Sequence, residues 1–89
     1  MDPSVPTVRY GPSLKIVKHT VAAELVANVG SVVVAVGDRV GPADTLVILE
    51  SMKMEIPVLA EVDGVVSELA VTAGDAIREG DVIAVIDGG

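Results

Sequence analysis

The chain repeats itself after 37 residues, and this repeat constrains the fold more than any other feature of the sequence. The polar matches are Gly37-Asp38 with Gly74-Asp75, Glu24 with Glu61, and Asp44 with Asp81; the apolar ones include Val21 with Val58, Val29 with Val66, Val40 with Ile77 and Leu46 with Ile83. Chance can align valines in a chain that has 19 of them, but it does not readily align the polar residues. The repeat therefore indicates two copies of one supersecondary unit.

Each copy predicts two strands, a Gly-Asp turn, a very short strand, a second turn and a final strand. Valine favours strands, and the absence of Phe and Trp means that the core must be aliphatic. In the Gly-Asp turns, Gly supplies a positive φ and Asp accepts hydrogen bonds from nearby amides. Short strands with regular turn signals indicate a sandwich or flattened barrel. We expect an all-β flattened barrel or sandwich of two four-stranded halves, related by a pseudo-two-fold axis.

The two copies meet at residues 49–56, where a polar link joins two apolar runs and predicts a β-hairpin. The shortest closure places Met52-Lys53 in a two-residue turn, which usually needs positive φ and therefore strains both residues. The same register sets Glu50 opposite Glu55, a like-charged pair that disfavours the strand pairing. Sequences break local rules mainly at functional sites, so the pattern indicates a presented lysine. One turn of helix or an ordinary exposed loop is the alternative interpretation.

By the same symmetry, the first and last strands are expected to be neighbours, across the domain from Lys53. Residues 1–19 are rich in Pro and Gly, and we interpret them as a flexible leader or cloning remnant. Residues 20–88 form the expected domain. The single histidine, His19, is interpreted as a surface residue without a partner.

Composition excludes several classes of function. The net charge is −7, and beyond residue 19 the only cationic side chains are Arg39, Lys53 and Arg78. Such an acidic body repels nucleic acid and anionic membranes. The chain has no cysteine, which excludes thiol catalysis and thiolate metal sites. Its apolar runs are far too short to span a membrane, and no secretory signal opens it, so we expect a cytoplasmic protein.

The residues Glu50-Ser51-Met52-Lys53-Met54-Glu55 resemble the biotin attachment motif of biotin carboxyl carrier domains, whose core is Met-Lys-Met. The paired Gly-Asp turns on either side resemble those of the same family. Ser51 stands where the family usually has Ala. No insertion separates Val29 from Gly37, so the chain resembles the thumbless type of biotinyl domain.

The resemblance implies a carrier and not an enzyme. A biotin protein ligase would attach biotin covalently to Lys53, and the domain would then shuttle CO₂ between a biotin carboxylase and a carboxyltransferase. Met52 and Met54 would mark the site as biotinyl. Glu50, Ser51 and Glu55 would form the rest of the hairpin that the ligase recognises. No catalytic residue and no metal ligand is implied.

Two other functions stay open at this point. A lipoyl carrier domain shares the fold, but usually has Asp before and Ala after the lysine, where this chain has Met52 and Met54. An unmodified β-sandwich that binds a partner through its acidic surface would explain the fold, although not the strained tip. An enzyme is the least favoured class, because no carboxylate pair or histidine stands in a catalytic pattern.

Overall fold

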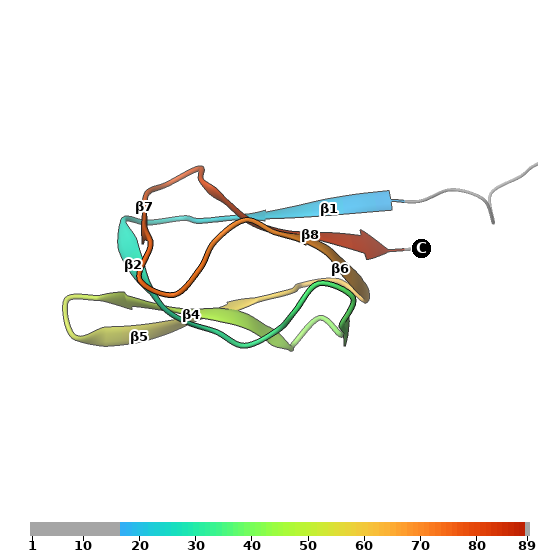
Figure 1. The fold of residues 1–89 in the computed structure, drawn as a ribbon, viewed down its shortest axis with the longest axis horizontal. Helices are drawn as coiled ribbons and strands as arrows, with labels where there is room; N and C mark the ends of the chain where they lie inside the picture. The colour runs from blue at the N-terminus through green and yellow to red at the C-terminus, as the bar shows by residue number, and fades with distance from the viewer. Residues whose placement is uncertain (1–16, 89) are drawn as a thin grey trace, which may run out of the picture.

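The computed structural model describes residues 17–88, which form eight strands and no helix (Figure 1). The strands are β1 (Val17–Ala22), β2 (Ala27–Val32), β3 (Arg39–Val40), β4 (Thr45–Ser51), β5 (Met54–Leu59), β6 (Gly64–Leu69), β7 (Ala76–Ile77) and β8 (Val82–Gly88). The first strand begins at Val17, three residues before the domain boundary expected from the sequence. The rest of the expected leader lies outside the described residues.

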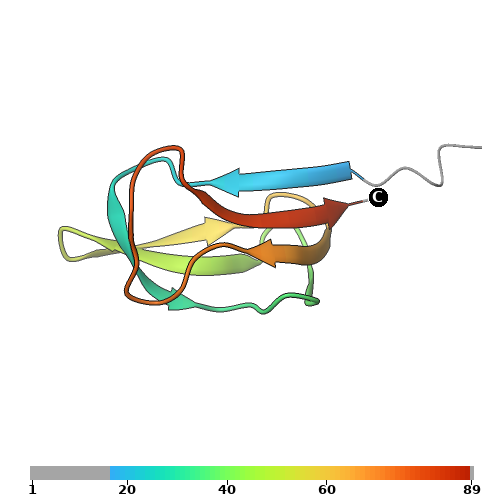
Figure 2. The same cartoon turned by 45° about the horizontal axis from the view of Figure 1, so that its top comes forward.

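The strands form two four-stranded antiparallel sheets that pack face to face. Their orders are β1-β8-β6-β3 and β5-β4-β2-β7. Each sheet takes two strands from each half of the sequence, so neither half forms a sheet by itself. The two layers are visible in Figure 2, which shows a flattened sandwich and not a closed barrel. The predicted all-β architecture is confirmed.

A shift by 37 residues carries every strand onto another strand with the same bounds. It converts β1 to β5, β2 to β6, β3 to β7 and β4 to β8. Applied to the strand order of the first sheet, the shift yields the order of the second. The predicted pseudo-two-fold relation is therefore confirmed, and the axis exchanges the two sheets.

The core between the sheets is aliphatic, as the composition predicts. Its fully buried side chains come in pairs related by the repeat, such as Leu46 with Ile83, Leu49 with Ile86, and Val29 with Val66. No polar or charged side chain among the described residues is buried. Burial of apolar surface is thus the main stabilising contribution.

The Gly-Asp turns have the predicted chemistry. Gly37 and Gly74 have φ values of 98° and 95°, in the region that favours glycine. The Asp38 carboxylate accepts a hydrogen bond from the Ala35 amide at 2.9 Å, and Asp75 accepts the equivalent bond from Thr72 at 2.9 Å. These turns place the two short strands at one edge of each sheet.

The strands β1 and β8 pair along their whole length, from Val17 opposite Gly88 to Ala22 opposite Val82. This confirms that the first and last strands are neighbours. Figure 1 shows their free ends at one end of the molecule and the β4–β5 hairpin at the other. The hairpin therefore projects away from Val17 and Gly88, the outermost described residues.

Candidate functional site

The hairpin between β4 and β5 closes through the two residues predicted for its turn. Met52 has φ of 52° and Lys53 has φ of 67°, and two successive positive values match the twist of paired strands. A left-handed conformation costs a residue with a side chain about 1–2 kcal/mol. The tip is therefore strained at the residues that the sequence singles out, and the surrounding ladder holds them in place.

The side chains of the tip project into solvent. Met52 is 92% exposed and Met54 is 61% exposed. Lys53 is also exposed, and within residues 17–88 its amine makes no hydrogen bond or ion pair. An unpaired amine on a flexible four-carbon stem is suited to accept an acyl group once deprotonated.

The like-charged pair beneath the tip also forms as predicted, with Glu50 opposite Glu55 in the ladder. The equivalent positions in the other sheet are Asp87 and Lys18, which form an ion pair of 2.8 Å between Lys18 Nζ and Asp87 Oδ1. Their hydrogen bond raises the pKa of Lys18 and lowers the pKa of Asp87. The hairpin thus has two carboxylates where the equivalent site has a salt bridge.

Glu50 lies over the neighbouring strand β2. A Cβ atom at Gly30 would stand 2.8 Å from Glu50 Cγ, which is closer than packed carbon atoms approach, so Gly30 leaves the space that this side chain occupies. Asn28 pairs with Glu50 across β2 and β4. Gly30 and Asn28 were not predicted as part of the site. The repeat contains information that could have identified these two residues. If β6 pairs with β8, the shift by 37 residues requires β2 to pair with β4.

All six residues predicted for the site come together around the tip. With Asn28 they line a shallow depression of about 400 Å³: Glu50, Ser51, Met52, Lys53, Met54 and Glu55. The depression is open and mostly polar, with acidic groups on its walls. This arrangement can present a lysine to a large partner, but it does not enclose a substrate.

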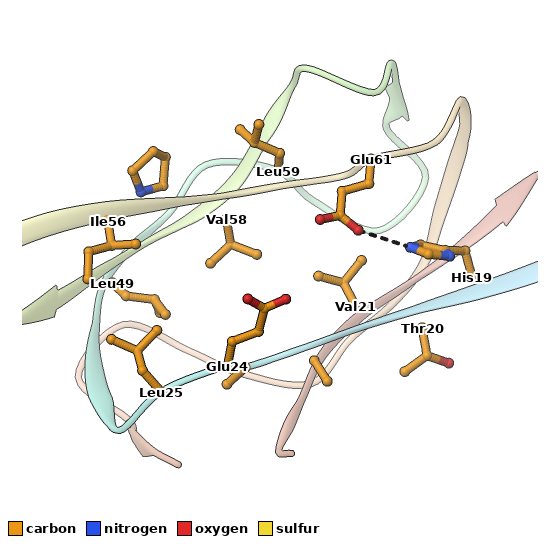
Figure 3. A pocket seen from close by; sticks show the side chains of 13 residues that line it. His19, Thr20, Val21, Glu24, Leu25, Leu49, Ile56, Val58, Leu59 and Glu61 are labelled. Atoms are coloured by element: carbon orange, nitrogen blue, oxygen red, sulfur yellow. Dashed lines mark ion pairs between the residues drawn. The ribbon is translucent and has the colours of Figure 1, made fainter. Parts of the chain in front are cut away.

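The prediction that His19 has no partner is wrong. Its Nε2 lies 3.6 Å from Glu61 Oε1. The contact crosses from β1 to the turn after β5, where Glu61 has φ of 70°. It lies at the end of a groove between β1 and β5 (Figure 3).

Other kinds of site find no support in residues 17–88. The described part of the chain contains no group of three His, Asp or Glu side chains placed to hold a metal ion. It also contains no helix that is long and apolar enough to cross a membrane. The hairpin is the site with the most specific geometry.

The tip fits the covalent group that the resemblance implies. The modified amine must protrude, must not be held by a neighbour and must carry features that a modifying enzyme can read. Within the described part of the chain Lys53 meets the first two requirements, and the exposed Met52 and Met54 together with the left-handed turn supply the third.

Comparisons with known proteins agree with this geometry. The profile of the biotin/lipoyl family described as "Biotin-requiring enzyme" matches residues 15–86. A biotinylated protein TB7.3 homolog of Mycobacterium leprae is 62% identical over 66 residues, covering 74% of this chain and 93% of that protein. A biotin/lipoyl attachment protein of Bacillus subtilis is 42% identical over 64 residues, covering 72% of this chain and 88% of that protein.

A solved structure shows a similar domain inside a large enzyme. The urea carboxylase of Kluyveromyces lactis matches with a TM-score of 0.74 and 30% identity, covering 94% of this chain and 7% of that one.

Proposed function

Because the chain belongs to the biotin/lipoyl family of biotin-requiring enzymes and is a biotin carrier domain, we propose that Lys53 is the residue that carries the biotin. The observation that carries this proposal is the amine of Lys53, which has no partner among residues 17–88 and stands at a strained and exposed hairpin tip. When attached, biotin supplies the chemistry of CO₂ transfer, and the chain supplies position and reach.

The residues around Lys53 have separate roles in this proposal. The left-handed turn at Met52 and Lys53 directs the lysine outward, since the paired strands β4 and β5 fix its base. Met52 and Met54 offer apolar surface to the ligase. Glu50, Ser51 and Glu55 form the polar edge of the surface that the ligase reads, and an acidic edge of this kind selects a partner with basic groups.

The partners follow from the carrier role. A biotin protein ligase using ATP would make the amide bond at Lys53, with the amine as nucleophile. A biotin carboxylase and a carboxyltransferase would then receive the arm in turn. Similarity to a domain of a urea carboxylase supports carboxylase partners of this kind. The cytoplasmic location expected from the sequence is part of the same proposal, and cell fractionation tests it.

Lipoylation is the second candidate, because the family includes lipoyl attachment. Met52 and Met54 argue against it, since they stand where lipoyl domains usually have Asp and Ala. Replacing both, as Met52→Asp with Met54→Ala, is expected to slow biotinylation by at least tenfold. Initial rates with a biotin ligase measure this, and unchanged rates would show that the ligase does not read the methionines.

The deciding experiment is intact mass after incubation with ATP, magnesium, biotin and a biotin protein ligase, with a lipoyl ligase reaction alongside. We expect a gain of one biotinyl group, mapped to Lys53 by peptide sequencing. Lys53→Arg abolishes the gain while leaving the fold intact, because the tip buries little surface. Lys18→Arg is the matched control, since it changes a lysine at the opposite end and retains the gain.

Biotin incorporation that persists in Lys53→Arg would refute the site. A lipoyl adduct without a biotinyl one would assign the domain to the lipoyl carriers. No adduct from either ligase would favour a protein that binds its partner unmodified.

A further inference from the structure

A groove of about 480 Å³ runs between β1 and β5, the outer strands of the two sheets (Figure 3). This volume falls within the range of small-molecule sites. The two strands face each other without pairing, so the groove reaches the side of the core. Figure 3 shows Val21, Leu25, Leu49, Ile56 and Val58 along it. Its lining therefore combines aliphatic side chains with a comparable share of polar surface, to which His19, Glu24 and Glu61 contribute.

The pseudo-two-fold axis converts β1 to β5 and passes through this groove, so its two ends would be alike if the sequence repeat were perfect. Glu61 and its equivalent Glu24 both line the groove, Glu61 beside His19 and Glu24 nearer to Leu25 (Figure 3). The ends differ because His19 pairs with Glu61 at 3.6 Å, whereas the equivalent of His19 is Ile56. Among the described residues Glu24 has no ion pair or hydrogen bond. The end at His19 and Glu61 is thus closed by a polar contact. The other end combines apolar side chains with the Glu24 carboxylate, a hydrogen-bond acceptor that has no partner among the described residues.

The open end faces the hairpin. Side chains alternate along a strand, so Met54, Ile56 and Val58 share one face of β5, and Leu49 lies opposite Ile56 on β4. Met54, Ile56 and Val58 form an apolar track from the tip to the groove, and the fully buried Leu49 lies beneath it. Ile56 is three residue steps along the strand from Lys53, a span of about 10 Å. The lysine side chain and the pentanoyl chain of biotin are together longer than this span.

We propose that the hairpin end of this groove is a resting site for the biotin carried by Lys53, an inference that rests on the proposed function. The apolar chain and sulfur-containing ring of biotin pack against Leu25, Ile56 and Val58, which are half-buried. The ureido N–H groups donate hydrogen bonds to the Glu24 carboxylate. The contact is non-covalent and reversible.

Because biotin would be tethered to Lys53, a groove of low affinity is sufficient to bind it for much of the time. A group on a short flexible arm has an effective concentration in the millimolar range at sites within its reach. A groove with only millimolar affinity for free biotin is then occupied for about half of the time. A carrier needs this weakness, because the arm must leave the groove whenever a partner enzyme competes for it.

The test is methyl NMR on the intact chain before and after biotinylation, with the product verified by mass. We expect shifts at Leu25, Ile56 and Val58, with NOE contacts from the biotin ring to at least two of them. Val62, the equivalent of Leu25 under the repeat, is the internal control and stays unshifted. Changes confined to residues 51–55 would overturn the proposal. Absence of any biotinyl group on Lys53 would instead overturn the proposed function.

A matched pair of variants tests the carboxylate. Both Glu24 and Glu61 are exposed, so Glu24→Ala and Glu61→Ala are expected to fold. Glu24→Ala reduces the methyl shifts and speeds capture of the biotinylated protein by streptavidin about twofold, because the fraction of free arm rises from half to nearly all. Glu61→Ala leaves the shifts and the capture rate unchanged. Equal behaviour of the two variants would overturn the role of Glu24 and with it the proposed site.

Discussion

Residues beneath the hairpin tip have counterparts at the far end of the molecule that form more favourable local contacts. Glu55 corresponds to Lys18, which pairs with Asp87, whereas Glu55 faces Glu50. Gly30 corresponds to Ser67, whose hydroxyl donates to the Val85 carbonyl at 3.1 Å. The equivalent positions in the other sheet thus form a salt bridge and a hydroxyl hydrogen bond, and the hairpin has neither. We infer that the acidic surface at the tip is retained for recognition.

At this scale, Glu55→Lys is expected to stabilise the fold and to impair the site. A lysine opposite Glu50 replaces repulsion by attraction, a change worth about 0.2–1 kcal/mol for a cross-strand pair. Biotinylation of Lys53 slows because the acidic edge is lost. Urea denaturation and ligase kinetics measure the two effects, with the modified lysine identified by peptide mapping.

The reciprocal change, Lys18→Glu, is the control. It creates a like-charged pair with Asp87 at the far end, and is expected to lower stability while leaving the ligase rate unchanged. If Glu55→Lys is biotinylated as fast as the parent chain, the carboxylate is not part of the recognition surface.

The sequence predicted the left-handed turn and the facing glutamates, because both follow from the length of the hairpin loop. It did not predict the contact between His19 and Glu61. That contact depends on how β1 packs against the turn after β5, and on a left-handed φ at Glu61 that nothing in the residue type announces. The position of Glu50 over Gly30 was missed for a similar reason, since it requires the neighbouring strand.

The two strand pairs β4–β5 and β1–β8 are equivalent elements that are held together differently. A two-residue turn joins β4 to β5 covalently. No turn joins β8 to β1, and the ion pair between Lys18 and Asp87 lies near their free ends. The hydrogen bond between these groups lowers the pKa of Asp87 below its ordinary 3.8 and raises the pKa of Lys18 above its ordinary 10.5. The pair therefore stabilises β1–β8 over a defined range of pH.

The range follows from the two shifts. The contribution of Asp87 is complete above its ordinary pKa and is lost as the pH falls through the lower value of the folded state. The contribution of Lys18 is complete below its ordinary pKa and is lost as the pH rises through the higher folded value. Lys18→Met is therefore expected to be less stable than the parent between about pH 4 and pH 10, and the difference shrinks outside that range.

Urea midpoints across the pH range measure this difference, which is small because Lys18 is well exposed. Arg78→Met is the control, since Arg78 has no ion pair within residues 17–88. A Lys18→Met deficit that is the same at pH 2.5 and pH 7 would show that packing of the aliphatic stem, and not the charge, is what was lost.

The repeat predicted these elements well, because each strand in one half has a partner in the other. It did not predict the shifts of register, at Val29 to Ser31 in β2 and at Val66 to Glu68 in β6. A shift of this kind is set by two strands together, and the pattern of a single strand does not contain it. That the two shifts occur at equivalent positions shows that they belong to the repeat.

For the molecule as a whole, the symmetry means that the two sheets contribute alike to one core. Val29 and Val66 are the clearest case, since they are the same residue at equivalent positions, 2% and 0% exposed. Neither lines the groove or the depression at the tip. The sheet that carries the hairpin and the sheet that contains β1 and β8 are therefore equally well packed at these positions.

Val29→Ala and Val66→Ala are accordingly expected to destabilise the fold equally, each by about 2 kcal/mol for the loss of two buried methyl groups and the cavity left behind. Equilibrium urea unfolding measures both, with equal slopes if each variant unfolds in two states. A cost for Val29→Ala below half that of Val66→Ala would show that the sheet with the hairpin is packed more loosely.

Because Val17 and Gly88 are adjacent, residues 17–88 can be inserted as a domain within another protein. Neighbouring residues of paired strands lie about 5 Å apart, so the two ends fit a gap no wider than an ordinary surface loop. A coding segment for residues 17–88 can be spliced into a host protein at such a loop without stretching either partner. Because the hairpin points away from the splice, the inserted cassette keeps its lysine clear of the host.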